Sequence, residues 1–106
     1  MKMTETQMVN WKSIPQKYAK DIRKALDLLK YEGCKTVYLF GSMVTGKIHN
    51  DSDIDIGIRG LPSDKFFSVY SKLYWNLDNN FSLVDFDSDN SFYSLLIRHN
   101  EVVVIE

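Results

Sequence analysis

The chain has 106 residues, of which 44% are hydrophobic and 25% are charged, so we expect one globular domain (residues 1–106) with a single core. The 13 basic residues nearly balance the 14 acidic ones, which disfavours a general nucleic-acid binder, because such proteins neutralise phosphates with a basic excess. No apolar run reaches the roughly 20 residues of a membrane span. The N-terminus lacks the apolar stretch of a signal peptide, so we predict a cytoplasmic protein.

The N-terminal third predicts a loose segment and then an amphipathic helix. Residues 1–12 are mostly polar, and we expect them to be flexible. Between Ile14 and Gly33, apolar residues recur at helical spacing after a proline start, and the glycine marks the end. The charged residues of this helix, Asp21 among them, are expected on a solvated face. Cys34, the only cysteine, excludes an internal disulfide and is predicted to be a buried thiol.

The rest of the chain alternates predicted strands and helices. We expect strands at 35–40, 53–58, 81–87 and 101–105, and helices at 63–77 and 91–99. This order is typical of an α/β (α+β) domain in which helices pack on one small mixed sheet. The helix at 63–77 is rich in aromatic residues, and Phe67, Tyr70 and Tyr74 share one side of it. We predict that they belong to the core rather than to a binding surface.

Residues 41–48 look at first like a phosphate-binding loop. Gly41 to Lys47 has the spacing of a Walker A motif, but Ile48 stands where that motif needs a Ser or Thr for magnesium. A turn and a strand then follow, instead of the long helix that would face the phosphates. We therefore reject a Walker A loop.

Asp53 and Asp55 form a second candidate for phosphate chemistry. In a strand, residues i and i+2 point the same way, so the two carboxylates lie side by side while the isoleucines between them face the core. Adjacent carboxylates repel each other unless a cation lies between them, and Mg²⁺ is the oxygen-seeking candidate. The alternative is an acidic surface strand, which is the commoner meaning of such a triplet by itself.

A Gly-Ser corner precedes this acidic pair. Gly41 lets a phosphate approach the backbone, and a helical turn that begins at Ser42 would direct amide and hydroxyl groups at it. Gly46 then permits the chain to reverse towards the acidic strand. Together, corner and strand predict a site that grips a nucleotide triphosphate through metal ions.

The motifs G-S-x-x-x-G and S-D-x-D, within residues 41–55, resemble the signature of the DNA polymerase β superfamily of nucleotidyltransferases, and especially of its minimal (MNT-type) members. The resemblance is detailed from Tyr38 to Ile58, and the order of elements extends it over nearly the whole chain. It implies a polymerase-β-like fold and a magnesium-dependent transfer of a nucleoside monophosphate, AMP from ATP, to an acceptor. A protein tyrosine, an RNA end and a small molecule all stay open as acceptors.

The resemblance also implies roles for single residues. Gly41 and Ser42, with Ser52 in the turn before the acidic pair, would bind the triphosphate. Asp53 and Asp55 would hold two Mg²⁺ ions, completed by a third carboxylate from a neighbouring strand. For that third ligand we choose Asp85 first, and Asp87 lies nearer the strand end.

Two positions depart from the family pattern. Relatives carry V-D-x-x-D on the third strand, and in that register Ser82 takes the place of the first acid and Asp85 that of the second. The activating-metal site would then be incomplete, and the chain would be a nucleotide-binding interaction subunit with weak or no turnover. Met43 replaces an arginine of the relatives. Lys47 is the candidate substitute for this arginine, and the alternative is that Lys47 is simply an exposed lysine of the turn.

The resemblance finally implies a partner. Minimal nucleotidyltransferases are paired with a helical protein of the HEPN class, often as the antitoxin that adds AMP to the toxin. The predicted elements use nearly the entire chain, so we expect such a complex or a homo-oligomer. The first helix and the aromatic segment Phe66 to Trp75 are the expected contact surfaces.

Overall fold

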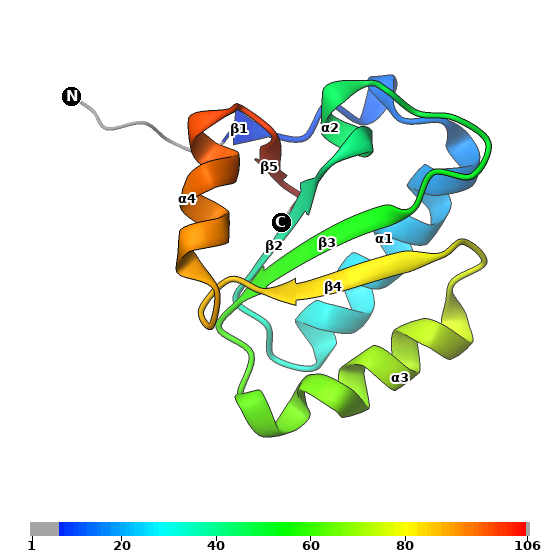
Figure 1. Cartoon of the computed structure of the whole chain (residues 1–106). Coiled ribbons are helices and arrows are strands. Elements are labelled where there is room, and N and C mark those ends of the chain that lie inside the picture. The colour runs from blue at the N-terminus through cyan, green and yellow to red at the C-terminus, as the bar shows by residue number, and fades with distance from the viewer. Residues whose placement is uncertain (1–6, 106) are drawn as a thin grey trace.

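The computed structural model describes residues 7–105, which form a five-stranded sheet with helices on both faces (Figure 1). The strands are β1 (Gln7–Met8), β2 (Thr36–Phe40), β3 (Ile54–Arg59), β4 (Phe81–Asp85) and β5 (Val102–Val104). The helices are α1 (Gln16–Tyr31), α2 (Ser42–Thr45), α3 (Phe66–Asn76) and α4 (Asn90–Arg98), with 3-10 turns η1 (Trp11–Ser13) and η2 (Ser63–Lys65).

The sheet is mixed, in the order β1-β5-β2-β3-β4. β2 runs antiparallel to both β3 and β5, whereas β3 pairs in parallel with the edge strand β4. In this parallel pair Asp55 lies opposite Ser82, and Ile58 lies opposite Asp85. The α/β class and the mixed sheet that the sequence predicted are confirmed.

The face of the sheet covered by α1 and α3 holds the main hydrophobic core. The alternating residues Ile54, Ile56 and Ile58 of β3 are fully buried there. They form one cluster with apolar residues of both helices, including Ile22 and Leu29 of α1 and Val69 and Leu73 of α3. Each buried aliphatic side chain contributes about 1.5–3 kcal/mol, so this cluster fixes the backbone of the strand that carries the acidic pair.

The opposite face is covered at one end by α4. A second cluster there joins Tyr38, Phe40, Phe86, Leu96 and Val102. The Phe86 ring lies directly on Gly57, since a Cβ atom at this glycine would collide with it. Gly57 and Asp55 share this face of β3, so the aromatic cluster begins where the acidic pair ends.

The N-terminal segment contains structure that the sequence did not predict. Gln7 and Met8 pair in parallel with β5, and the Asn10 side chain accepts a hydrogen bond from the Lys12 amide at the start of η1. Residues 1–6, the rest of the segment that we expected to be flexible, lie outside the described residues.

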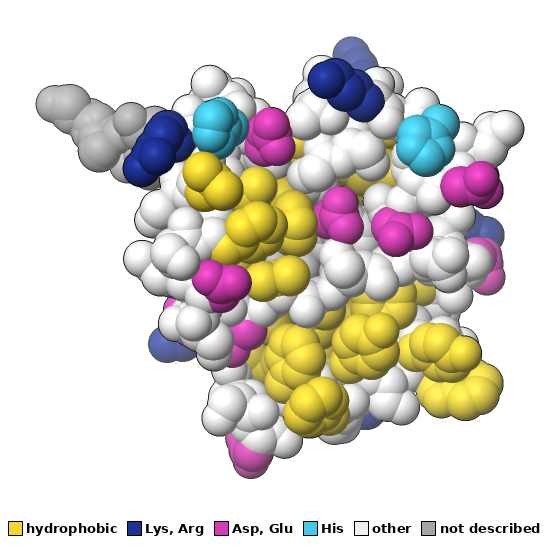
Figure 2. Space-filling view, in the orientation of Figure 1, with side chains coloured by type: hydrophobic (Ala, Val, Ile, Leu, Met, Phe, Trp, Pro, Cys, Tyr) yellow, Lys and Arg dark blue, Asp and Glu magenta, His cyan; other side chains and the backbone are white. Residues whose placement is uncertain are grey.

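Three aromatic side chains of α3, Phe67, Tyr70 and Tyr74, are exposed rather than buried in the core, contrary to our prediction, whereas Phe66 packs against the main core. Val69 and Leu73 face the sheet and are fully buried, whereas Phe67, Tyr74 and Trp75 are 82%, 62% and 79% exposed. Because β4 is the edge strand, α3 has a neighbour on one side only, and its aromatic side stays open. Figure 2 shows the resulting apolar patch over α3.

Cys34 is buried as predicted. Its thiol lies 3.3 Å from the carbonyl oxygens of Thr36 and Arg59, and burial raises its pKa. Among the helices of residues 7–105, none has the length and apolar composition needed to cross a membrane.

Candidate functional site

The acidic pair lies at the start of β3, on the same face of the sheet as α4 but at the end that α4 leaves uncovered. The Ile54 amide, between the two aspartates, donates a hydrogen bond of 2.9 Å to the Asn80 carbonyl just before β4. Asp53 is exposed and Asp55 is half-buried. In Figure 2, acidic side chains lie between two hydrophobic patches on this face of the molecule.

The electrostatics of Asp55 indicate two carboxylates close to each other. Burial raises the pKa of Asp55, a hydrogen bond from the Ser82 hydroxyl opposes the rise, and the charge of Asp53 adds to it. The pair therefore carries a repulsion that a bound cation would relieve.

The Gly-Ser corner lies against Asp55. β2 ends at Phe40, directly opposite Asp55, and Gly41 follows with φ 74° and ψ −144°. A Cβ atom at Gly41 would collide with Oδ2 of Asp55, so glycine is required both by the backbone and by the carboxylate. α2 begins at Ser42, as predicted, and the amides of Val44 and Thr45 donate to the Gly41 carbonyl oxygen.

Met43, which replaces the arginine of the relatives, and Lys47, the candidate substitute for that arginine, differ in their positions. Met43 is buried in the main core, so this position directs its side chain away from the acidic pair. Lys47 is exposed in the loop that follows α2, and its phosphate role stays a prediction.

Ser52 is engaged in the turn before Asp53. It is buried, its hydroxyl accepts a 2.8 Å hydrogen bond from the His49 amide, and its own amide donates to the His49 carbonyl. The Tyr18 hydroxyl of α1 donates to the same carbonyl at 3.1 Å. The geometry therefore gives Ser52 a role in holding the turn that presents Asp53, and the phosphate contact that we expected of Ser52 stays a prediction.

Asp85 is not the third member of the acidic site. It lies opposite Ile58, three residues further along the strand pair, and its carboxylate accepts hydrogen bonds from the Asp87 amide (2.9 Å) and the Ser88 hydroxyl (3.2 Å). The residue opposite Asp55 is Ser82, whose hydroxyl donates a 2.7 Å hydrogen bond to Oδ1 of Asp55. This corrects our first choice and agrees with the alternative register, in which Ser82 takes the place of the acid.

Asp87 does not complete the site either. Its carboxylate accepts hydrogen bonds from the Gly60 amide and from Arg59 at the far end of β3, and the Gly60 hydrogen bond lowers its pKa. No group of three or more metal-ligating His, Cys, Asp or Glu side chains occurs within residues 7–105. At this site, Asp53 and Asp55 alone among the described residues therefore offer carboxylate oxygens of the kind that Mg²⁺ prefers, and the two bound Mg²⁺ ions that we expected stay a prediction.

Asp21 has a role that the sequence analysis missed. It is fully buried, and its Oδ2 atom accepts hydrogen bonds from the amides of Asp78 and Asn79 and from the Asn79 side chain, at 2.7–2.9 Å. The signal was its spacing, because it lies three residues after Tyr18 and four before Ala25, on the buried side of α1. Asp21 thus holds the loop between α3 and β4.

A cleft of about 380 Å³ adjoins the acidic pair. Its walls come from the C-terminal half of α3, the loop that Asp21 holds and the first residue of β4. The lining residues are Asp53, Tyr70, Tyr74, Leu77, Asp78, Asn79, Asn80 and Phe81.

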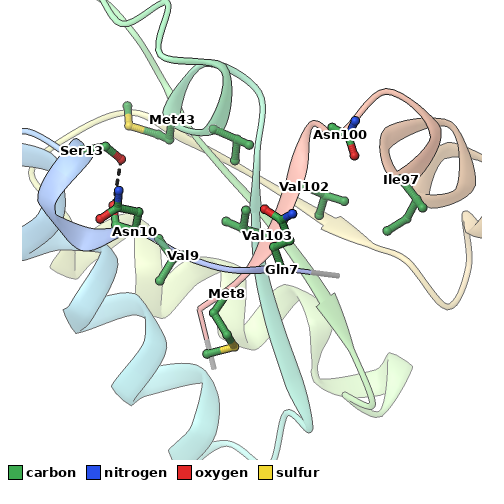
Figure 3. Close-up of a pocket in the computed structure, with 11 residues that line it drawn as sticks. Gln7, Met8, Val9, Asn10, Ser13, Met43, Ile97, Asn100, Val102 and Val103 are labelled. Atoms are coloured by element: carbon green, nitrogen blue, oxygen red, sulfur yellow. Dashed lines mark hydrogen bonds between the residues drawn. The ribbon is translucent and has the colours of Figure 1, made fainter. Parts of the chain in front are cut away.

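A second hollow, of about 350 Å³, lies between β1, β5, the end of α4 and α2 (Figure 3). Met43 and Val44 of α2 belong to its wall, and Asn10 and Ser13, joined by a hydrogen bond, lie at one side. Its lining residues carry no formal charge, so it lacks the groups that bind a metal or neutralise a triphosphate.

Two toxin–antitoxin complexes are among the solved structures that are similar to this chain. A toxin–antitoxin complex with AMP-PNP aligns with a TM-score of 0.61 and 29% identity, over 77% of this chain and 69% of that chain. A mutant of the toxin–antitoxin MntA–HpeT aligns with a TM-score of 0.51 and 31% identity, over 62% of this chain and 57% of that chain. No curated protein matches the sequence.

The family comparison covers most of the chain. Residues 20–106 match the family described as polymerase beta, nucleotidyltransferase, and this range includes the Gly-Ser corner, the acidic pair and Ser82. The MntA–HpeT similarity supports a minimal nucleotidyltransferase. The chain therefore belongs to the polymerase β nucleotidyltransferase family.

Proposed function

We propose that this chain binds ATP with Mg²⁺ and transfers AMP to a partner protein in the cytoplasm. One observation carries the proposal: the backbone of the Gly-Ser corner touches the carboxylate of Asp55, which shares its strand face with Asp53. A phosphate-binding corner and a cation-binding pair in contact are what a metal-bound triphosphate requires. The similar toxin–antitoxin complex with AMP-PNP supports a nucleotide as the ligand of this chain.

Different residues would bind the phosphates and the cation. The first amides of α2 have no partner within the helix, so they and the Ser42 hydroxyl are available to donate to the terminal phosphates. Asp53 and Asp55 would hold the cation. When bound there, Mg²⁺ neutralises negative charge on the triphosphate and on the departing pyrophosphate.

Transfer requires that the acceptor hydroxyl attack the α-phosphorus. The bond from this phosphorus to the bridging oxygen breaks, pyrophosphate leaves, and the hydroxyl proton passes to a base. A carboxylate opposite Asp55 would serve that purpose, but Ser82 offers a hydroxyl that is itself a donor to Asp55. We therefore expect slow turnover.

Ser82 also favours a second candidate, a nucleotide-binding interaction subunit without efficient turnover. Ser82→Asp separates the two possibilities, because it places a carboxylate opposite Asp55. We expect this variant to raise the rate of AMP transfer by at least about 100-fold, the scale of general acid–base catalysis. If the parent already transfers AMP as fast as the variant, Ser82 does not limit the reaction.

The partner that we propose is a helical toxin of the HEPN type. The two similar structures described above are toxin–antitoxin complexes. The exposed aromatic residues Phe67 and Trp75 of α3, which lie outside the cleft beside Asp53, are the contact surface that this chain offers.

The test uses ATP labelled at the α-phosphate, Mg²⁺ and a HEPN-type toxin. Label in the toxin, together with released pyrophosphate, is the expected result. Magnesium-dependent ATP binding without label in the toxin would favour the second candidate. Neither binding nor transfer would contradict the proposed function.

A further inference from the structure

We propose that the cleft beside Asp53 binds the nucleoside part of the triphosphate substrate, the ribose and base. This inference rests on the proposed function, because it assumes that the triphosphate lies along the Gly-Ser corner and the acidic pair. It assigns the nucleoside to this cleft, and it predicts that Tyr74 and Asn80 determine the specificity for that nucleoside.

The strand order indicates in which direction a bound nucleotide extends from the Gly-Ser corner. The Gly-Ser corner follows β2, the acidic pair belongs to β3, and the cleft is lined by the start of β4 and by α3. Since β3 lies between β2 and β4, the corner and the cleft are on opposite sides of the acidic pair. A triphosphate with its terminal phosphates at the corner and its α-phosphate at the acids directs its nucleoside towards the cleft.

The lining of the cleft suits a nucleoside. Tyr70 and Tyr74 of α3 offer partly exposed ring faces, and Tyr70 packs on Phe81 with 5.0 Å between ring centroids. Aromatic rings of this kind stack on bases. The exposed amide of Asn80 carries both a donor and an acceptor for base edges. A volume of about 380 Å³ lies within the range of small-molecule sites.

The cleft is held in shape by buried contacts. The buried carboxylate of Asp21 accepts hydrogen bonds from the amides of Asp78 and Asn79. On the surface, Lys20 forms an ion pair of 3.2 Å with Asp78. The Asn80 carbonyl in turn binds the Ile54 amide between the two aspartates. The wall that would contact the nucleoside is thus joined directly to the strand that would hold the cation.

The test compares ATP with inorganic tripolyphosphate, each titrated with Mg²⁺ into the full chain. Tripolyphosphate has the phosphates but no nucleoside. Tyr74→Ala should weaken ATP binding by about 10-fold, the scale of one lost stacking contact, and leave tripolyphosphate binding unchanged. Asn80→Ala should act in the same direction without altering an aromatic residue. Phe67→Ala, an exposed aromatic of the same helix outside the cleft, is the matched control and should change neither affinity.

The outcomes separate this inference from the proposed function. If neither ligand binds the parent in the presence of Mg²⁺, the proposed function fails, and the inference fails with it. If both bind, but Tyr74→Ala and Asn80→Ala leave ATP affinity unchanged or weaken both ligands equally, only the nucleoside site is overturned. Unchanged ATP binding with reduced transfer to a toxin would assign the cleft to the acceptor instead, and would also overturn the inference.

Discussion

The two ends of β3 share one face of the sheet but are covered differently. At the far end, Gly57 admits the ring of Phe86, and the aromatic cluster under α4 excludes water. At the near end, Gly41 admits the carboxylate of Asp55, and the small side chain of Ser82 lies opposite. Each end thus depends on a glycine for a close approach. One strand is therefore packed for stability at one end and left polar for chemistry at the other.

The largest expected effect is at the packed end. Gly57→Val places a branched side chain where the Phe86 ring lies, and the buried ring has no free space to move into. We expect the free energy of unfolding to fall by about 3 kcal/mol, measured by urea denaturation. Phe86→Leu in the same chain should recover part of the loss. If Gly57→Val unfolds at the parent's urea midpoint, the ring does not pack as described.

A smaller loss is expected when the glycine at the open end is changed. Gly41→Ala meets both a positive φ and the Asp55 carboxylate, and we expect a loss of about 2 kcal/mol. This variant should also lose magnesium-dependent ATP binding, which Gly57→Val should retain while it stays folded. Gly46→Ala is the matched control, because Gly46 has a positive φ too but open space around it. Equal ATP affinities for the two alanine variants would contradict a special role for Gly41.

The smallest effect concerns the charge of Asp55. Since the pKa of Asp55 is raised in the folded chain, its protonated form contributes stability that is fully present below the ordinary pKa of 3.8 and is lost as pH rises through the folded pKa. At neutral pH without metal, Asp55→Asn should therefore stabilise the chain, by up to about 1 kcal/mol because the group is partly exposed. The difference between parent and variant should vanish in acid. A variant less stable than the parent at neutral pH would contradict a raised pKa of Asp55 that burial and the charge of Asp53 cause.

The open end was largely predictable from sequence because its signals are local. Asp53 and Asp55 alternate with isoleucines, and Gly41 with Ser42 marks a strand-to-helix corner, so spacing alone brought these residues together. The third residue of the site, which lies opposite Asp55 on β4, was less predictable from the sequence. Whether Ser82 or Asp85 faces Asp55 depends on the register between β3 and β4, and neither strand specifies that register by itself.

Other features depended on contacts between distant segments. The helical spacing of Asp21 places it on the buried side of α1, but it does not indicate that a loop nearly sixty residues later in the chain supplies three hydrogen-bond donors to its Oδ2 atom. The aromatic residues of α3 occur on both sides of that helix. Hydrophobicity therefore did not distinguish the side of Val69, which faces the sheet, from the side of Trp75, which faces solvent.

The most direct test of the cation site is a calorimetric titration of ATP into the parent and into Asp53→Asn, each in Mg²⁺ and in EDTA. Asp53 is exposed, so its substitution leaves the packed core intact. We predict that Mg²⁺ strengthens ATP binding to the parent and that Asp53→Asn weakens binding in Mg²⁺ by about 100-fold, removing the difference between Mg²⁺ and EDTA. The same magnesium-dependent affinity in parent and variant would contradict a cation held by Asp53 and Asp55.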